Sequence, residues 1–382
     1  MHACMHALAM RKLFSPLVLQ QPAQRIMLSL SYLGSKKSLL PFLESVINPL
    51  ITPDTTFCDY FMGSGCVSNH FKKHPHVSKI IAGDMEVYSY VFGKALLNVP
   101  FTYKLAMIID QLNNINLASQ NAGIVERNFA SGDKLFFSKE NAARIDLVRI
   151  SLSKLYHANK ITYDEFLFLL ASLLVSASAC SNTCGTFRAH LKHLCARAKK
   201  KFKLLPIHHD NVMAKKRAHV VKKCDAVDMA HRYNKNNKNT IVYLDPPYNA
   251  CHYGAYYSFL NYLCIYDGTL KLNGTGILDN YNKSKFGLAK QALQQFSKLF
   301  NILSTSKYII LSYSSEGVLG LNQVIEIAKN HGSVTVYKIW YKSYKSKQDC
   351  AKRGHVIEYI IVVHCGHDST TPSMVRKMWL KL

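Results

Sequence analysis

The stretch TTFCDYFMGSGCVSNHFKKHPHVSKIIAGD (residues 55–84) carries the pattern that decides the fold. Its opening, "TTFCDYF", is rich in β-branched and aromatic residues and predicts a strand, which the glycine turn "MGSG" ends. The next piece, "VSNHFKK", predicts a short helix, and "SKIIAG" predicts a second strand that Asp84 follows at once. A strand–turn–helix–strand unit of this kind opens an α/β sheet.

The same alternation continues outside this stretch, apart from one interruption. "EVYSYVFGKALL" predicts a helix, "NTIVYLD" and "SKYIILSYSSEG" predict strands, and "LNQVIEIAKNHG" predicts another helix. "SVTVYKIWYKSYKSK" and "HVIEYIIVVH" predict an antiparallel pair joined by a basic loop. Residues 100–205 are mostly helical in pattern, as in "ENAARIDLVRISLSKLY". The sequence therefore predicts an α/β sheet with a helical insertion.

The chain is strongly basic, which points to a polyanionic partner. It has 382 residues, 48% of them hydrophobic, and a formal net charge of +25. This length suggests two domains. Residues 188–238 contain 15 Lys or Arg against three acids. Such a run is usually a solvated face, but one of a single sign fits a phosphate-facing surface at least as well. The charge does not distinguish DNA from RNA.

The cysteines and the most apolar segment indicate neither a metal site nor a membrane span. The eleven cysteines are scattered without a paired CxxC pattern, which predicts reduced thiols in a cytosolic protein. "FLFLLASLLVSASAC" (residues 166–180) is shorter than the roughly 20 residues that cross a bilayer, so it predicts a buried helix. Residues 1–26 lack the pattern of a signal peptide and are interpreted as an extension.

The glycine turn and the acid after the second strand suit a nucleoside. Gly63 and Gly65 follow the strand that contains Asp59, and Asp84 ends the next strand. Glycines let the backbone approach a ligand, and an acid at the tip of the second strand accepts hydrogen bonds from ribose hydroxyls. The full GxGxxG is missing, so a pyrophosphate cofactor fits less well. A GSG turn alone is often only a turn.

A second constellation, Asp245-Pro246-Pro247-Tyr248, stands at the carboxyl end of a predicted strand. Open α/β sheets bind ligands at that edge. An ionised aspartate only accepts hydrogen bonds, and the prolines remove two backbone donors. Tyr248 adds a flat aromatic face. The set suits an exocyclic amine on a nucleobase, whereas Pro-Pro alone more often indicates a turn.

Two further stretches have both a functional and a structural interpretation. "YLGSKK" places Tyr32 and Lys36 in a polar loop, where they could contact a cofactor or simply form a loop. After DPPY, aromatic side chains could stack on a flipped base or pack in the core; these are Tyr253, Tyr256, Tyr257 and Phe259.

In this order, "YLGSKK", "DYFMGSG", "AGDME" and "DPPY" resemble the Dam-like, α-ordered class of N6-adenine DNA methyltransferases of type II restriction–modification systems. The resemblance runs from about residue 28 to residue 364. It implies a seven-stranded, Rossmann-like methyltransferase sheet, S-adenosyl-L-methionine as methyl donor, and target recognition by the region between the glycine turn and DPPY. After DPPYN the chain departs from the family's polar stretch at Cys251, His252, Tyr256 and Ser258.

The resemblance also implies roles for individual residues. Asp84 would hold the ribose of the cofactor, and Asp225 would contact its adenine. Asp245 would face both the cofactor and the target amine, while Tyr248 would stack on the target adenine. The complete cofactor set is Tyr32, Lys36, Asp59, Gly63, Gly65, Asp84, Asp225 and Asp245. The catalytic set is Asp245, Pro246, Pro247 and Tyr248, with no metal.

These expectations divide the chain into an extension (1–26), two catalytic parts (27–100 and 206–366), a helical target-recognition insertion (101–205) and a tail (367–382). The partner is double-stranded DNA, with phosphate contacts from the basic run and from the hairpin residues Lys342, Lys345, Lys347, Lys352 and Arg353. We expect a monomeric, nucleoid-associated protein of the bacterial cytoplasm. A cognate restriction endonuclease would act on the same DNA site.

Four alternatives remain open from the residues. An N4-cytosine methyltransferase more often carries serine where Asp245 stands. An RNA methyltransferase would be equally basic. A DNA-binding remnant of the family would have lost cofactor binding. A methyltransferase that acts on protein amines usually pairs asparagine with Pro-Pro-Tyr.

Overall fold

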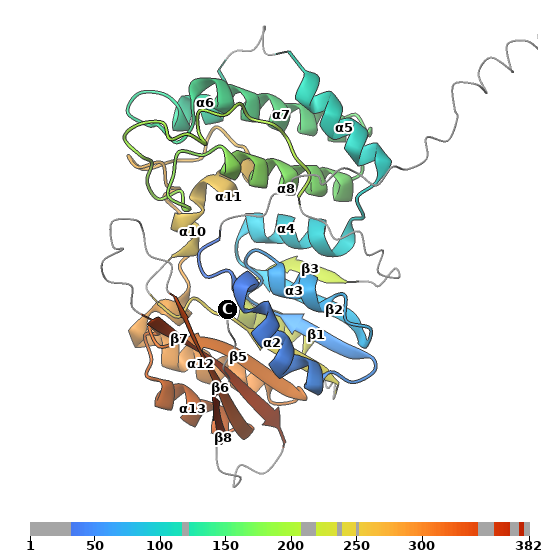
Figure 1. Ribbon diagram of the computed structural model, residues 1–382, viewed down its shortest axis with the longest axis vertical. Coiled ribbons are helices and arrows are strands. Elements are labelled where there is room, and N and C mark those ends of the chain that lie inside the picture. Colours follow the sequence, from blue (N-terminus) through green and yellow to red (C-terminus); the bar gives the residue numbers. More distant parts are fainter. Residues whose placement is uncertain are drawn as a thin grey trace, which may run out of the picture.

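A mixed eight-stranded sheet is the framework of the molecule, and a helical region covers one end of it (Figure 1). The computed structural model describes residues 32–116, 122–207, 219–234, 239–249, 252–342, 355–366 and 374–377. The strand order is β3-β2-β1-β4-β5-β7-β6-β8. The predicted α/β class is confirmed.

Five neighbouring strands are parallel, and their carboxyl ends therefore meet at one edge of the sheet. Connections between parallel neighbours need a crossover, and helices supply most of them here. The five strands are β1 (Thr55–Asp59), β2 (Val77–Asp84), β3 (Val220–Lys223), β4 (Thr240–Leu244) and β5 (Tyr308–Ser314).

The remaining strands close the other side of the sheet. β7 (His355–Cys365) lies antiparallel between β5 and β6 (Gly332–Lys342), as the alternating pattern predicts. β8 (Met374–Lys377) pairs parallel with β6. The seven strands of the expected methyltransferase sheet are present, and β8 is an eighth strand within residues that the sequence presents only as a tail.

Helices cover both faces of the sheet, so the strands are buried on both sides. On β4, Ile241 and Tyr243 pack into one cluster, whereas Val242 and Leu244 pack into the opposite one. The first face is covered by α2 (Leu40–Ile47), α3 (Cys66–Phe71) and the end of α4 (Val87–Asn98), and the second by α9 (Ala226–Tyr233), α12 (Ala289–Leu303) and α13 (Leu321–Lys329). Short 3₁₀ turns are η1 (Lys36–Leu39), η2 (Asn48–Leu50) and η3 (Lys285–Gly287).

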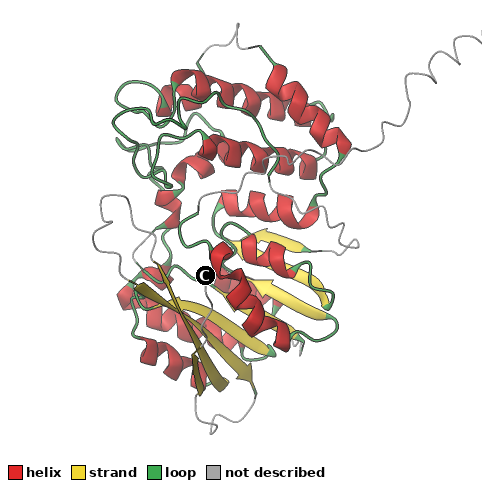
Figure 2. Ribbon diagram, in the orientation of Figure 1, coloured by secondary structure: helices red, strands yellow, loops and turns green. Residues whose placement is uncertain are grey.

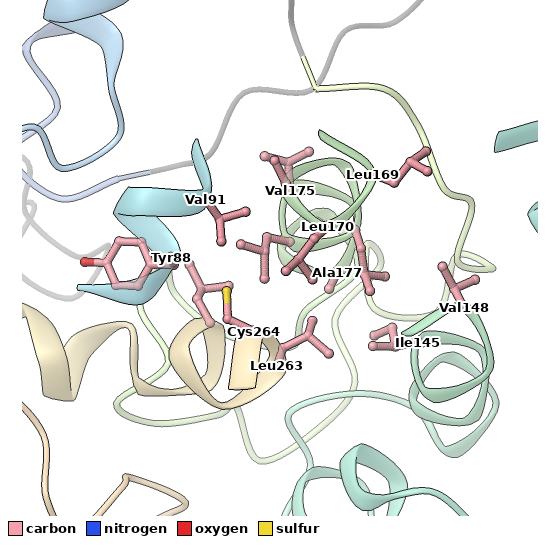
Figure 3. Close-up of a cluster of buried hydrophobic side chains, with 14 of the residues drawn as sticks. Tyr88, Val91, Ile145, Val148, Leu169, Leu170, Val175, Ala177, Leu263 and Cys264 are labelled. Atoms are coloured by element: carbon pink, nitrogen blue, oxygen red, sulfur yellow. The ribbon is translucent and has the colours of Figure 1, made fainter. Parts of the chain in front are cut away.

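The helical region has its own core, which α4 joins to the sheet (Figure 3). Val91 of α4 points toward side chains of α8 in this cluster, and α4 contacts both α8 and α11. Figure 2 shows helices joined by loops above the strands. The helices are α5 (Tyr103–Asn114), α6 (Ile124–Phe129), α7 (Lys139–His157), α8 (Tyr163–Ala179), α10 (Tyr253–Tyr256) and α11 (Ser258–Ile265).

α11 adds a second piece of chain to the helical region, which the sequence places only at residues 101–205. Its Leu263 and Cys264 are buried among α7 and α8. The buried guanidinium of Arg149, on α7, donates to the Leu263 and Cys264 carbonyl oxygens at 2.9 and 3.0 Å. These bonds satisfy carbonyls that a helix end leaves without an internal partner. The segment after DPPY is therefore attached to the helical region, as well as to the sheet.

Candidate active site

The carboxyl ends of the parallel strands bring the separate motifs to one open cavity, whose empty space is about 620 Å³ with adjoining solvent included. The glycine turn follows β1, Asp84 ends β2, Asp225 follows β3, and Asp245 follows β4. Adjacent strands that point the same way place the residues after them side by side. The cavity is lined by Tyr32, Tyr60, Phe61, Gly63, Asp84, Met85, Glu86, Cys224, Asp225, Ala226, Asp245, Pro247, Tyr253, Asn282, Ser284 and Phe286.

The glycine turn forms part of the cavity wall, and its two glycines have left-handed backbone conformations. Gly63 has φ +52° and Gly65 has φ +75°, conformations that favour glycine. A Cβ on Gly63 would lie 3.1 Å from the ring of Tyr32. The Gly63 N–H donates to Asp84 Oδ2 at 2.8 Å, which ties the turn to the end of β2. Gly65 caps α3 and does not line the cavity.

Two acids stand at the end of β2. Asp84 Oδ1 accepts from the Glu86 N–H at 2.9 Å, and burial raises the pKa of Asp84. Burial also raises the pKa of Glu86 to about 7. Asn261 of α11 donates to Glu86, and its side-chain oxygen accepts from the Val87 N–H at 3.0 Å. Asn261 therefore links the segment after DPPY to the start of α4 and to the cavity wall.

A buried lysine joins Asp245 to a second carboxylate. Lys36 Nζ lies 2.8 Å from Asp245 Oδ1 and 3.2 Å from Glu358 Oε1. Lys36 is 4% exposed and Glu358 is fully buried. Burial alone would lower the pKa of Lys36, but attraction to the two carboxylates raises it well above its ordinary value. Burial raises the pKa of Asp245, and Lys36 opposes that shift.

The rest of the DPPY motif frames Asp245. Pro247 lines the cavity, and the Tyr248 carbonyl accepts from the Val318 N–H at 2.7 Å. The Tyr248 ring centroid lies 5.6 Å from Lys36 Nζ and 5.9 Å from the ring of Tyr313, which meets it edge-on. Tyr248 is thus held by its neighbours while remaining partly exposed.

Aromatic rings close the side of the cavity near Tyr32. The Tyr32 ring stacks on Tyr257 at 4.6 Å and on Tyr253 at 5.5 Å. Tyr257 and Phe259 are fully buried, so for them the core-packing interpretation is confirmed. Tyr253 is partly exposed and lines the cavity. The Tyr256 ring contacts the guanidinium of Arg188 at 5.6 Å.

Comparison with known proteins identifies the family. The model of the D12 class of N6 adenine-specific DNA methyltransferases matches residues 32–324. The chain belongs to this family. It is 32% identical to the type II methyltransferase M.NlaIII of Neisseria lactamica, over 83% of this chain and 93% of the relative. It is 31% identical to M.CviAII of Paramecium bursaria Chlorella virus 1, over 88% of this chain and 98% of the relative.

A third relative is longer. The type II methyltransferase M.FokI of Planomicrobium okeanokoites is 30% identical over 86% of this chain, which spans 52% of that relative. The adenine-specific DNA methyltransferase activity and the Rossmann-like methyltransferase fold inferred from the four motifs are confirmed. In the described part of this methyltransferase, no helix is both long and apolar enough to cross a membrane.

Three residues of the predicted cofactor set do not line the cavity. Lys36 contacts the Asp245 carboxylate without lining the cavity, and Gly65 is the N-cap of α3 at the end of the turn. Asp59 is 1% exposed, and its Oδ2 accepts from the Ser68 hydroxyl at 2.6 Å. Burial raises the pKa of Asp59 to about 7. Contact between these three residues and a cofactor stays a prediction.

The sequence analysis missed several residues at or next to this cavity. Glu86 stands two positions after Asp84 in "AGDME", so a second acid at the end of β2 was visible in the motif. Glu358 lies in "VIEYIIV", where a lone acid in an apolar strand was the available signal. Nothing local indicates that Asn261 reaches Glu86. Cys251 lies outside the described residues.

Asp59→Asn is expected to flatten the pH dependence of stability. The pKa of Asp59 is raised on folding, so its contribution is fully present below about pH 4 and is lost as pH rises through about 7. Between pH 5 and pH 8 the variant should gain about 2 kcal/mol relative to wild type in urea unfolding. Asp54→Asn, at an exposed turn with φ +63°, is the control and should follow wild type. An unchanged slope in Asp59→Asn would contradict the assignment.

Proposed function

We propose that this methyltransferase binds S-adenosyl-L-methionine in the cavity at the carboxyl edge of the sheet and uses it to methylate adenine N6 within a specific DNA sequence. The observation that carries the proposal is the meeting of the Gly63 turn, Asp84, Asp225 and Asp245 around one cavity. The residues fit the cofactor: the turn lets backbone approach it, and carboxylates accept from hydroxyl and amino groups.

The proposed cofactor contacts follow the chemistry of each wall. When bound, S-adenosyl-L-methionine supplies an electrophilic methyl group on a sulfonium. Asp84 accepts from the ribose hydroxyls, and Asp225 accepts from the adenine amine. Tyr32 provides an aromatic wall beside Gly63, and Asp245 faces the methionine end. Asp59 Oδ1, which has no hydrogen-bond partner among the described residues, can accept a further donor.

Asp245 and the Pro246 carbonyl hold the target amine. The adenine is flipped out of the duplex, at a cost of a few kcal/mol. Its N6 donates to these two acceptors while Tyr248 stacks on the ring. Asp245 can accept this bond besides that from Lys36, because an ionised carboxylate has about four acceptor positions. The methyl donor is already activated, so positioning and electrostatics supply most of the acceleration.

The helical region is proposed to recognise the target sequence. Its loop after α8 is held by buried asparagines: Asn182 donates to the Leu191 carbonyl at 3.1 Å, and Asn141 donates to the Lys200 carbonyl at 2.9 Å. The loop thereby presents exposed basic side chains, namely Arg188, Lys192, Lys199, Lys200, Lys201 and Lys203. The hairpin residues Lys345, Lys347, Lys352 and Arg353, and the side chain of Lys342, lie outside the described part.

The double variant Lys199→Ala/Lys201→Ala tests the phosphate-binding surface. Each lysine that neutralises a phosphate releases counterions, so the salt slope of DNA binding should fall by about 2 and affinity should drop equally on all sequences. Fluorescence anisotropy across a salt series measures both. The matched control is Lys290→Ala/Lys298→Ala, two exposed lysines on α12. An effect no larger than that of the control would place DNA elsewhere.

The proposed reaction is tested with labelled S-adenosyl-L-methionine and mixed-sequence DNA, followed by digestion to nucleosides. We expect the label in N6-methyladenine. Label in N4-methylcytosine would overturn the base assignment, and label only in a parallel RNA sample would make RNA the substrate. Calorimetry with the donor separates an enzyme from a remnant that no longer binds it.

We further propose that the enzyme is the modification component of a restriction–modification system, since its relatives carry type II methyltransferase names. The system would include a cognate endonuclease, and the enzyme would act as a monomer on the bacterial nucleoid. Methylome sequencing of an expressing host would give the recognition sequence. A host genome without a uniform methylated motif would contradict this role. Sedimentation equilibrium tests the oligomeric state.

A further inference from the structure

A buried carboxylate that the proposed reaction leaves unused stands beside the DPPY motif. Glu358, on β7, is fully buried. Its Oε1 accepts from the Ser312 hydroxyl at 2.5 Å and from Lys36 Nζ at 3.2 Å. Its Oε2 is buried without a hydrogen-bond partner among the described residues. A buried charge is costly, so packing alone does not explain why a glutamate stands at position 358.

We explain the buried Glu358 by the Lys36 ammonium, which it shares with Asp245. Lys36 contacts Asp245 at the shorter distance, 2.8 Å, and Glu358 at 3.2 Å. One positive charge therefore serves two carboxylates in a site almost closed to water. At such depth charges interact more strongly than at the surface. A change in the charge of Glu358 must change how strongly Lys36 holds Asp245.

We propose that Glu358 is a positioning residue for methyl transfer, which acts through Lys36 to keep Asp245 a strong hydrogen-bond acceptor for the target amine. The proposal rests on the role of Asp245 in the proposed function. Glu358 draws part of the Lys36 charge away from Asp245. It also fixes the ammonium between β7 and the DPPY motif, so that Asp245 keeps one orientation toward the cavity.

The sign of the pH effect follows from this geometry. With Glu358 neutral, Lys36 would attract Asp245 alone, and the pKa of Asp245 would fall. The acid limb of the kcat profile, where Asp245 becomes protonated and stops accepting, would move to lower pH. Other titratable groups that face this network are Asp59 on β1, Tyr243 on β4 and Tyr248 in the motif. All three are unchanged in the test variants.

The experiment compares Glu358→Gln and Glu358→Asp with wild type in steady-state methylation of a DNA that carries the recognition sequence, from pH 5.5 to 9. In Glu358→Gln the plateau kcat should fall about tenfold or more, with the KM for S-adenosyl-L-methionine within about threefold of wild type. Its acid limb should move down by about one pH unit. Glu358→Asp keeps the charge, so its acid limb should stay in place. Thermal melting reports whether each variant is folded.

The controls separate the proposed role of Glu358 from the proposed function on which it rests. Glu326→Gln, an exposed acid on α13, should match wild type. If Glu358→Gln does not fold, Ser312→Ala takes its place, because loss of the hydroxyl favours neutral Glu358 and should shift the limb the same way. A wild-type profile in a folded Glu358→Gln, or in Ser312→Ala, beside an inactive Asp245→Ala would overturn the role of Glu358 alone. An active Asp245→Ala would instead overturn the proposed function.

Discussion

Asp245→Ala is expected to lower kcat for adenine methylation by about 10³-fold or more. The substitution removes the carboxylate that we propose accepts from the target N6 amine, and preorganised polar groups of this kind are each worth about 10²–10³ in rate. It also leaves the ammonium of Lys36 facing the cavity with Glu358 as its remaining carboxylate. The labelled-donor assay with nucleoside analysis measures the loss.

Three further measurements show whether the loss is chemical. Asp245→Asn keeps the shape of the side chain, but Lys36 would take the amide oxygen and leave the donating NH₂ group facing the amine, so the variant should be nearly as inactive. Calorimetry should find the affinity for S-adenosyl-L-methionine lowered by no more than about tenfold, because the other cavity walls are intact. Asp228→Ala, at an exposed acid on α9, should keep full activity. A rate within tenfold of wild type in Asp245→Ala would refute the assignment.

Lys36→Met should cost about 3–5 kcal/mol in the free energy of unfolding. The lysine is 4% exposed and is the cation that contacts both Asp245 and Glu358. Removal of one partner from a buried ion pair is strongly destabilising because the opposite charge is left without compensation. Urea unfolding followed by circular dichroism measures the difference.

The loss should depend on pH. Without Lys36 the pKa values of both carboxyls rise further, so the variant loses stability as pH rises and its deficit is larger at pH 8 than at pH 5.5. Glu358→Gln added to Lys36→Met should recover part of the deficit, since one uncompensated charge disappears. Lys329→Met, in an exposed ion pair with Glu326, should change stability by less than about 1 kcal/mol. An equally small effect for Lys36→Met would mean that the buried pair adds nothing.

The core of the fold was readable from the sequence because its signals are local. The strand before Gly63, the turn itself and the acid after the next strand lie within thirty residues, "TTFCDYF" to Asp84. Parallel strands then force the residues that follow them to one edge. The placement of Asp84 and Asp245 at one edge follows from those two facts, whereas Asp225 joins them after β3, a strand that the sequence pattern did not predict.

Other features depend on contacts between distant segments, which no local pattern encodes. β8 pairs with β6 through backbone hydrogen bonds, and the types of its four residues do not predict this pairing. α11 belongs to the aromatic stretch after DPPY, and only its packing against α7 and α8 makes it part of the helical region. Asn261 reaches Glu86 only because α11 lies beside the start of α4.

The sequence by itself determined the α/β alternation, the order of the motifs and the place of Asp84 and Asp245 after predicted strands, because each rests on residue types close together in the chain. Tertiary structure alone decided which ionisable groups surround Asp245. Lys36 comes from the first turn of the described chain and Glu358 from the strand inserted between β5 and β6. Their contact exists because β7 runs antiparallel and so begins at the carboxyl edge of the parallel strands. We infer that this contact, in a site nearly closed to water, sets how strongly Asp245 can accept a hydrogen bond.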